Sequence, residues 1–153
     1  MLFRSPYAWS LASGSLPTGL SLGTNGAIGG TTSQTGLFPI RVRVTGANGA
    51  TTTGDLALSV VTPPVITTST LPAGSVNVAY ATALAASDGS GPYTWSLASG
   101  SLPTGLSLST GGTIGGTPTA GGTSTFSVRV TGSNGGVAMR SLSISVATPP
   151  SIG

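Results

Sequence analysis

The stretch that decides the fold occurs twice: residues 6–22 read PYAWSLASGSLPTGLSL and residues 92–108 read PYTWSLASGSLPTGLSL. The offset of 86 residues (92 − 6) continues without a gap to the pair Ile66 and Ile152. A repeat of this period predicts an array of small domains rather than one enzyme-sized body. Two full copies would need 172 residues (2 × 86), and the chain has 153, so we expect one copy to be incomplete.

The incomplete copy is expected at the N-terminus. Residues 63–91 precede the Pro-Tyr-x-Trp motif in the second copy, whereas only residues 1–5 precede it in the first, so we expect a window on a longer repeat protein. Thr62-Pro63-Pro64 and Thr148-Pro149-Pro150 are predicted to be stiff linkers, because Pro-Pro is extended and interrupts strand pairing. The predicted domains are an incomplete repeat, a complete repeat, and the start of a further repeat or a linker, at residues 1–62, 63–148 and 149–153.

The patterning of both copies predicts β-strands. The chain has 25 Gly and 11 Pro, which punctuate it every few residues, and no segment has helical periodicity. Phe126, Val128 and Val130 alternate with polar residues, as do Ile40 and Val42 in the first copy. Such a period of two, with one apolar face, predicts strands of a sheet that packs on a second sheet.

Two local motifs carry more specific predictions. Asn48-Gly49 and Asn134-Gly135 lie between apolar strands and predict hairpins with type I′ turns. Trp9 and Trp95 stand in the same triplet of both copies and alternate with Leu. We therefore interpret them as core residues of a central strand rather than as a ligand-binding platform.

The composition excludes most chemistry. Charged residues make up 5% of the chain, against about 25% in typical proteins, and Lys, Glu, His and Cys are absent. General acid–base catalysis lacks its usual residues, and no base is available to activate a serine, so we expect neither an enzyme nor a cofactor. The five Arg residues form no cluster with aromatic side chains, so no nucleic-acid partner is expected. Membrane insertion is not expected either, because no apolar run approaches about 18 residues.

Several ordered motifs resemble a known family, the immunoglobulin-like (cadherin-like) repeat domains found in tandem in large bacterial surface proteins. The motifs lie at residues 71–80, 91–97, 102–108, 112–118 and 126–131. The resemblance implies an all-β fold of tandem immunoglobulin-like β-sandwiches, the first lacking its N-terminal strands, with no catalysis. Relatives that bind calcium often carry Asp where this chain has Gly46 and Gly132, and Asp55 and Asp88 are each predicted to be isolated. Calcium needs several oxygen ligands, so no metal site is expected.

Few charges and a mean hydropathy of +0.36 are unusual for a freely soluble monomer. We therefore expect a non-catalytic structural repeat module of an extracellular or cell-surface assembly: a filament, a sheath or a surface stalk, with strand complementation as one route to polymerisation. The expected partners are copies of itself or neighbouring repeats of a longer chain. One alternative is an adhesin module that binds a surface glycan or host protein, and a weaker one is a virion decoration domain.

The incomplete first domain predicts where such an assembly makes contact. Without the counterparts of residues 63–91, an apolar face and a strand edge lack their cover, and such edges recruit strands from elsewhere. The predicted assembly interface consists of Leu2, Phe3, Tyr7, Trp9, Val65, Ile66 and Ile152. No catalytic, cofactor-binding or metal-binding residue is predicted.

Overall fold

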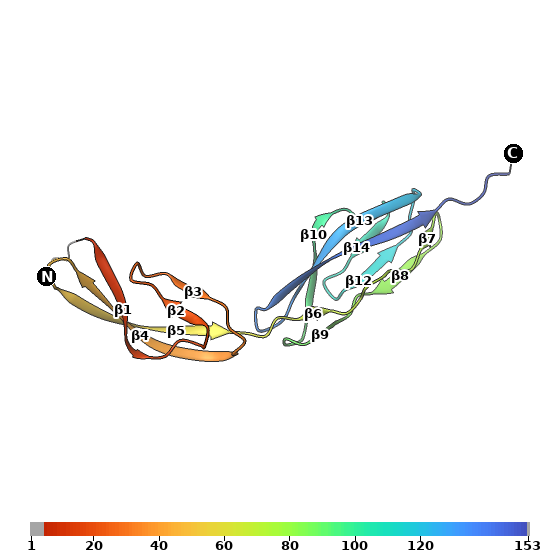
Figure 1. The fold of residues 1–153 in the computed structure, drawn as a ribbon. Coiled ribbons are helices and arrows are strands. Elements are labelled where there is room, and N and C mark those ends of the chain that lie inside the picture. Colours follow the sequence, from red (N-terminus) through yellow and green to blue (C-terminus); the bar gives the residue numbers. More distant parts are fainter. Residues whose placement is uncertain (1–4, 153) are drawn as a thin grey trace. The chain divides into compact units, whose positions relative to one another are not determined.

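The computed structural model describes residues 5–152, and this part of the chain contains strands, turns and loops but no helix (Figure 1). The chain divides into two compact units, residues 1–60 (unit 1) and residues 61–153 (unit 2). Each unit repeats the pattern of short strands and glycine-rich turns that the sequence predicts. The predicted all-β class is confirmed.

Unit 2 is built from nine strands in three sheets. A four-stranded sheet has the order β10-β13-β14-β7, in which only β7 runs parallel to its neighbour, and a three-stranded sheet has the order β11-β12-β8. A third, two-stranded sheet joins β6 to β9. The strands are β6 (Val65–Ile66), β7 (Gly74–Ser75), β8 (Tyr80–Ala83), β9 (Ala86–Ser87), β10 (Thr94–Gly100), β11 (Leu106–Leu108), β12 (Thr113–Gly116), β13 (Gly122–Thr131) and β14 (Val137–Ala147).

The core of unit 2 lies between these sheets. Alternate side chains of β13 and β14 point into it, as period-two patterning requires, and Trp95 on β10 is only 4% exposed. The segment before β10 contributes Ile66, Tyr80 and Leu84 to the same core. The predictions of a β-sandwich and of a core Trp95 are confirmed, but β10 is an edge strand of its sheet and not the predicted central strand. The buried residues are Ile66, Tyr80, Leu84, Trp95, Ile114, Phe126, Val128, Val130, Leu142, Ile144 and Val146.

Unit 1 has the counterparts of five of these strands. Its sheet has the order β1-β4-β5, and β2 and β3 form a separate hairpin (Figure 1). The 86-residue offset maps these strands onto β10 to β14, and a register shift after Leu11 recurs after Leu97. No strand in the described part of unit 1 corresponds to β6, β7, β8 or β9. The bounds are β1 (Tyr7–Gly14), β2 (Leu20–Leu22), β3 (Ile28–Gly30), β4 (Gly36–Gly46) and β5 (Thr51–Val60).

The hairpin between β4 and β5 forms, but its predicted turn type is wrong. The Gly49 N–H donates to the Gly46 carbonyl at 2.9 Å, and Gly49 alone has positive φ (81°), whereas a type I′ turn also needs positive φ at Asn48. The loop is a type I turn followed by a left-handed glycine. The Asn48 side chain accepts a hydrogen bond from the Ala50 N–H at 3.2 Å, and this side-chain bond stabilises the turn.

The hairpin register also corrects the prediction that Asp55 is isolated. Arg41 on β4 lies opposite Asp55 on β5, and the guanidinium donates to both carboxylate oxygens, at 2.6 and 2.7 Å. This bidentate pair lowers the pKa of Asp55 and raises the pKa of Arg41. The hydrogen bonds between the two side chains are the largest cause of both shifts. Both side chains are more than half exposed, so we expect the pair to contribute little to stability.

The stability of the folded chain is expected to be flat between about pH 5 and pH 9, because no His, Lys or Glu titrates there. The lowered pKa of Asp55 gives stability that is present above the unfolded value and lost as the pH falls through the folded one. Burial raises the pKa of Tyr80, so its contribution is present below about pH 10 and lost as the pH rises above it.

Denaturant midpoints measured from pH 3 to pH 11 test this profile. Asp55→Asn is expected to weaken the acid decline and Tyr80→Phe the alkaline one. A midpoint that changes between pH 6 and pH 7 would contradict the assignment.

Candidate functional site

The distinctive surface of unit 1 is an apolar face, made of residues whose counterparts in unit 2 are core residues. We call it the open face, and it consists of Trp9, Ile28, Val44 and Leu56. Trp9, Val44 and Leu56 line one hollow of about 290 Å³, together with Val42 and residues 52–54. The hollow lies over the inner side of the sheet, where a sandwich has its second layer.

Exposure differs sharply between identical residues of the two repeats. Ile28 is 40% exposed, whereas its counterpart Ile114 is 0% exposed. Leu56 is 52% exposed, whereas Leu142 is 5% exposed. Because the five shared strands pair with one another in the same register in both units, the difference comes from what packs on them.

Leu11 and Leu97 show that this difference is local to the open face. They are 38% and 39% exposed, although the sequence pattern predicts Leu97 to face inward with Trp95. The register shifts of β1 and β10 come directly after these two leucines and interrupt the alternation there. Both units therefore expose the leucine at this position, whether or not a second layer packs on the sheet.

The segment that buries these positions in unit 2 is residues 61–91, which we call the cover segment. Ile66, Tyr80 and Leu84 enter the core, and Leu71, Val76 and Ala86 pack against it partly buried. The Tyr80 hydroxyl donates to the Pro72 carbonyl at 2.8 Å, so this buried tyrosine is satisfied within the segment itself.

The cover segment also holds the strands of unit 2 by hydrogen bonds to their edges. β8 pairs with β12, and β7 pairs with the end of β14 at Val146 and Ala147. The Arg140 side chain donates to the Ile66 carbonyl at 3.0 Å. In the described part of unit 1, β3 pairs with β2 alone and β5 with β4 alone. Two strand edges of unit 1 therefore carry backbone groups available to another strand.

The residues of the predicted interface are distributed over both units. Tyr7 is 47% exposed and lies two positions before the half-buried Trp9 on β1. In unit 2 the counterpart Tyr93 donates its hydroxyl to the Asp88 carbonyl of the cover segment, at 2.6 Å. Leu2 and Phe3 lie outside the described residues.

The other predicted residues belong to unit 2. Val65 is 50% exposed and Ile152 is 101% exposed, and Ile66 at 4% exposed is a core residue of unit 2. Ile28, Val44 and Leu56 complete the open face and were not predicted from the sequence. Their identity with Ile114, Val130 and Leu142 was the available signal, since a residue that both repeats retain at a core position is expected to pack in both.

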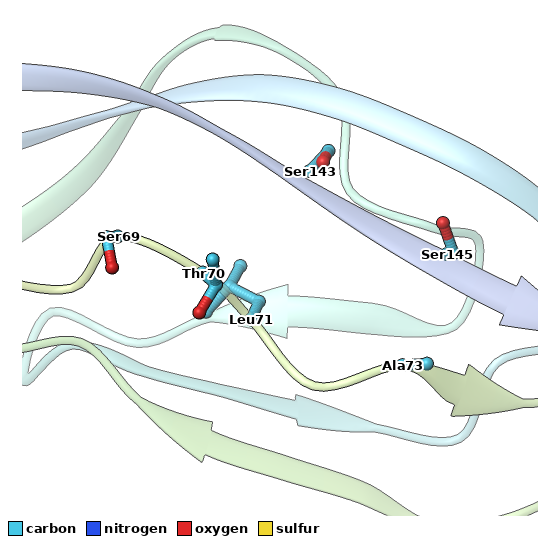
Figure 2. A pocket seen from close by; sticks show the side chains of 6 residues that line it. All are labelled: Ser69, Thr70, Leu71, Ala73, Ser143 and Ser145. Carbon is cyan, nitrogen blue, oxygen red and sulfur yellow. The ribbon is translucent and has the colours of Figure 1, made fainter.

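Unit 2 carries a hollow of about 260 Å³, whose lining consists of four residues with hydroxyl groups and the apolar residues Leu71 and Ala73 (Figure 2). Ser69 and Thr70 come from the loop after β6, and Ser143 and Ser145 come from β14. Ser145 also shares a hydrogen bond with Thr123 at 3.0 Å. Hydroxyls both donate and accept, so such a surface suits an uncharged polar ligand.

Among residues 5–152, no group of three His, Cys, Asp or Glu side chains lies close enough together to hold a metal ion. In the same residues, no helix has the length and apolar character that a membrane crossing requires.

The family model described as "Putative Ig domain" matches residues 4–61 and again residues 63–147. The chain belongs to this Ig domain family. The predicted resemblance to immunoglobulin-like repeats is therefore confirmed. Ig-like domains commonly act as extracellular structural or adhesive modules and typically carry no catalytic site, although a fold alone does not fix a function.

The solved structures that are similar to this chain belong to different classes of protein. A "putative alpha-galactosidase" from Bacteroides fragilis is 26% identical over 55% of this chain and 17% of its own, with a TM-score of 0.49. Extracellular cadherin domains 3–6 of protocadherin gamma B2 are 15% identical over 94% of this chain and 44% of their own, with a TM-score of 0.46. The chain thus spans less than half the length of either structure. A search of the curated proteins returned no match.

Proposed function

We propose that this chain is a non-catalytic structural repeat module of an extracellular or cell-surface assembly, such as a filament, a sheath or a stalk. The observation that supports it most is the open face, where Ile28 and Leu56 are 40% and 52% exposed although their repeat counterparts are core residues. Soluble monomers seldom leave a contiguous apolar patch uncovered, and it adjoins two strand edges.

The low charge of the chain supports the same role. Only seven residues are charged (five Arg and two Asp), and Arg41 and Asp55 neutralise one another. Surface charge keeps proteins apart in solution, so a chain with so few charges packs readily against uncharged neighbours. A module held among neighbours in a stalk or filament has no need of a repulsive surface.

The proposed partners are copies of the chain or neighbouring repeats, which would contact the open face and Tyr7. Leu2 and Phe3 precede this strand and belong to the same proposed interface. Val65 and Ile152 are the exposed apolar residues of unit 2 in that proposal. Ile66 acts within unit 2, where it is already packed.

Substitutions on the open face test this proposal in the isolated chain. Without its neighbours the chain is expected to self-associate through this face, and Leu56→Asp or Ile28→Asp is expected to weaken self-association at least about tenfold, because an unpaired carboxylate would be buried. Sedimentation velocity at rising protein concentration measures the effect.

Leu37→Asp is the matched control, because Leu37 is 68% exposed and alternates with the inward residues of β4. It is expected to leave the association unchanged. A wild-type chain that stays monomeric at high concentration and high salt would contradict the proposal. In native material, electron microscopy is expected to show regular fibres or stalks.

An adhesin is the second candidate, and the hydroxyl-lined hollow of unit 2 favours it. Four of its six lining residues, Ser69, Thr70, Ser143 and Ser145, carry hydroxyls, which can donate to and accept from a glycan (Figure 2). Dispersed protein in native material, retained on a glycan array and released by Ser143→Val, would favour this candidate over the structural one.

A further inference from the structure

We infer that the open face is an acceptor for one extended segment with the apolar pattern of residues 64–87, donated by another repeat of the family, and that its central strand pairs with β3. This inference rests on the proposed function and names the partner of the same surface. Its support is the internal repeat, because unit 2 shows which segment occupies the equivalent face.

The pairing of β8 with β12 defines the register of the donated strand. β8 runs antiparallel to β12, with Ala83 opposite Thr113 and Tyr80 opposite Gly116. Moved by 86 residues, the same register places a donor residue of the Ala83 type opposite Ala27, and one of the Tyr80 type opposite Gly30. β3 offers this edge, since its only strand partner among the described residues is β2.

The neighbourhood of Trp9 shows that the acceptor is already shaped as in unit 2. The backbone N–H of Trp9 donates to the Thr24 carbonyl at 2.9 Å, and the backbone N–H of Trp95 donates to the Thr110 carbonyl at 2.9 Å. Gly26 lies against the Trp9 ring, because a Cβ there would come within 3.0 Å of the indole. Gly112 has the same place against Trp95, and its carbonyl accepts from the Leu84 N–H of the cover segment at 2.8 Å.

The donor is identified by its side chains and its lack of charge. In unit 2, Tyr80 and Leu84 are 7% and 8% exposed and Ile66 is 4% exposed. Residues 61–87 contain no Asp, Glu, Lys or Arg, and the open face contains none either. The complex is therefore held by apolar burial and strand pairing, which salt does not screen.

A second copy of residues 5–152 does not satisfy this acceptor as donor. Each such copy has two faces of this type, one in each unit, and one cover segment, which unit 2 already binds. Transfer of that segment to another chain would expose Trp95, Ile114 and Leu142 in the donor, so the exchange removes one uncovered face and creates another. The occupant to which we commit is a segment carried by a different repeat.

The test uses the full chain of 153 residues and a synthetic peptide of residues 61–91 as the probe. Hydrogen–deuterium exchange is expected to show new protection at residues 27–30, and a labelled peptide is expected to bind with 1:1 stoichiometry. Peptides with Tyr80→Ser or Leu84→Ser are expected to bind at least about tenfold more weakly, because each removes a fully buried apolar side chain.

Val78→Ser is the matched peptide control, because Val78 is 57% exposed in unit 2, and its affinity is expected to stay within about threefold. In the full chain, Ile28→Asp is expected to abolish binding and Leu37→Asp to leave it unchanged. Since the decisive variants are in the peptide, a folding defect of the chain does not obscure the result.

Three outcomes would overturn the inference: no binding, protection at residues 113–116 instead of 27–30, or equal weakening by Val78→Ser and Tyr80→Ser. The second would mean that the peptide exchanges into unit 2, and the third that it adheres without register. If native material shows regular fibres together with any of these outcomes, the proposed structural role is supported and only the inferred donor segment is wrong.

Discussion

Ile114→Ala is expected to destabilise unit 2 by about 3 kcal/mol, whereas Ile28→Ala in unit 1 is expected to cost less than about 1 kcal/mol. The two residues occupy the same place in their repeats, but Ile114 is 0% exposed and Ile28 is 40% exposed. Removing a fully buried side chain loses its transfer free energy and leaves a cavity, while removing a half-exposed one leaves none. Leu142→Ala and Leu56→Ala are expected to differ in the same direction, with 5% and 52% exposure.

Urea unfolding followed by tryptophan fluorescence measures both effects. A Trp9→Phe background reports unit 2 through Trp95, and a Trp95→Phe background reports unit 1 through Trp9. Leu97→Ala and Leu11→Ala are the controls, because these residues are 39% and 38% exposed and should cost the same small amount in both units. Equal losses for Ile28→Ala and Ile114→Ala would show that the open face is covered in solution.

Much of the fold follows from the sequence, because strand patterning and hairpin turns are local properties. Phe126, Val128 and Val130 alternate with polar residues, and the structure buries them at 2%, 0% and 0% exposure. The type of the turn at Asn48-Gly49 did not follow. A loop of this kind needs one left-handed residue and not two, and the pair alone cannot distinguish these cases. The partner of Asp55 became evident only once the hairpin register placed it opposite Arg41.

The candidate site could be predicted only in part, for a physical reason. Tyr7 and Trp9 could be selected from the sequence because aromatic residues are few in the chain. The sequence around Leu56 does not distinguish it from the other leucines of predicted strands. The exposure of Leu56 depends on the layer that faces it, and strand periodicity carries no information about that layer. Leu142 demonstrates this, since the same residue at the same strand position is buried where residues 61–91 are present.

Deleting residues 61–91 is expected to abolish the cooperative unfolding of unit 2. Ile66, Tyr80 and Leu84 would be removed from the core, and full burial of each such side chain contributes about 1.5–3 kcal/mol. Trp95, Ile114 and Leu142 would in addition lose their cover. Together these losses reach the whole stability of a small domain, about 5–15 kcal/mol. Acrylamide quenching is expected to become as efficient for Trp95 as it is for Trp9.

Adding the peptide of residues 61–91 to this shortened chain is expected to restore both the unfolding transition and the shielding of Trp95. The restored transition would show that a cover segment can act without a covalent link to the face it buries, as we infer for the donor of unit 1. Deleting residues 1–60 is the control, and it should leave unit 2 unchanged, because the core of unit 2 is drawn from residues 66–146 alone. A shortened chain that still unfolds cooperatively, with Trp95 shielded, would mean that the five remaining strands are sufficient by themselves. Unit 1, which has the same five strands, would then need no donor.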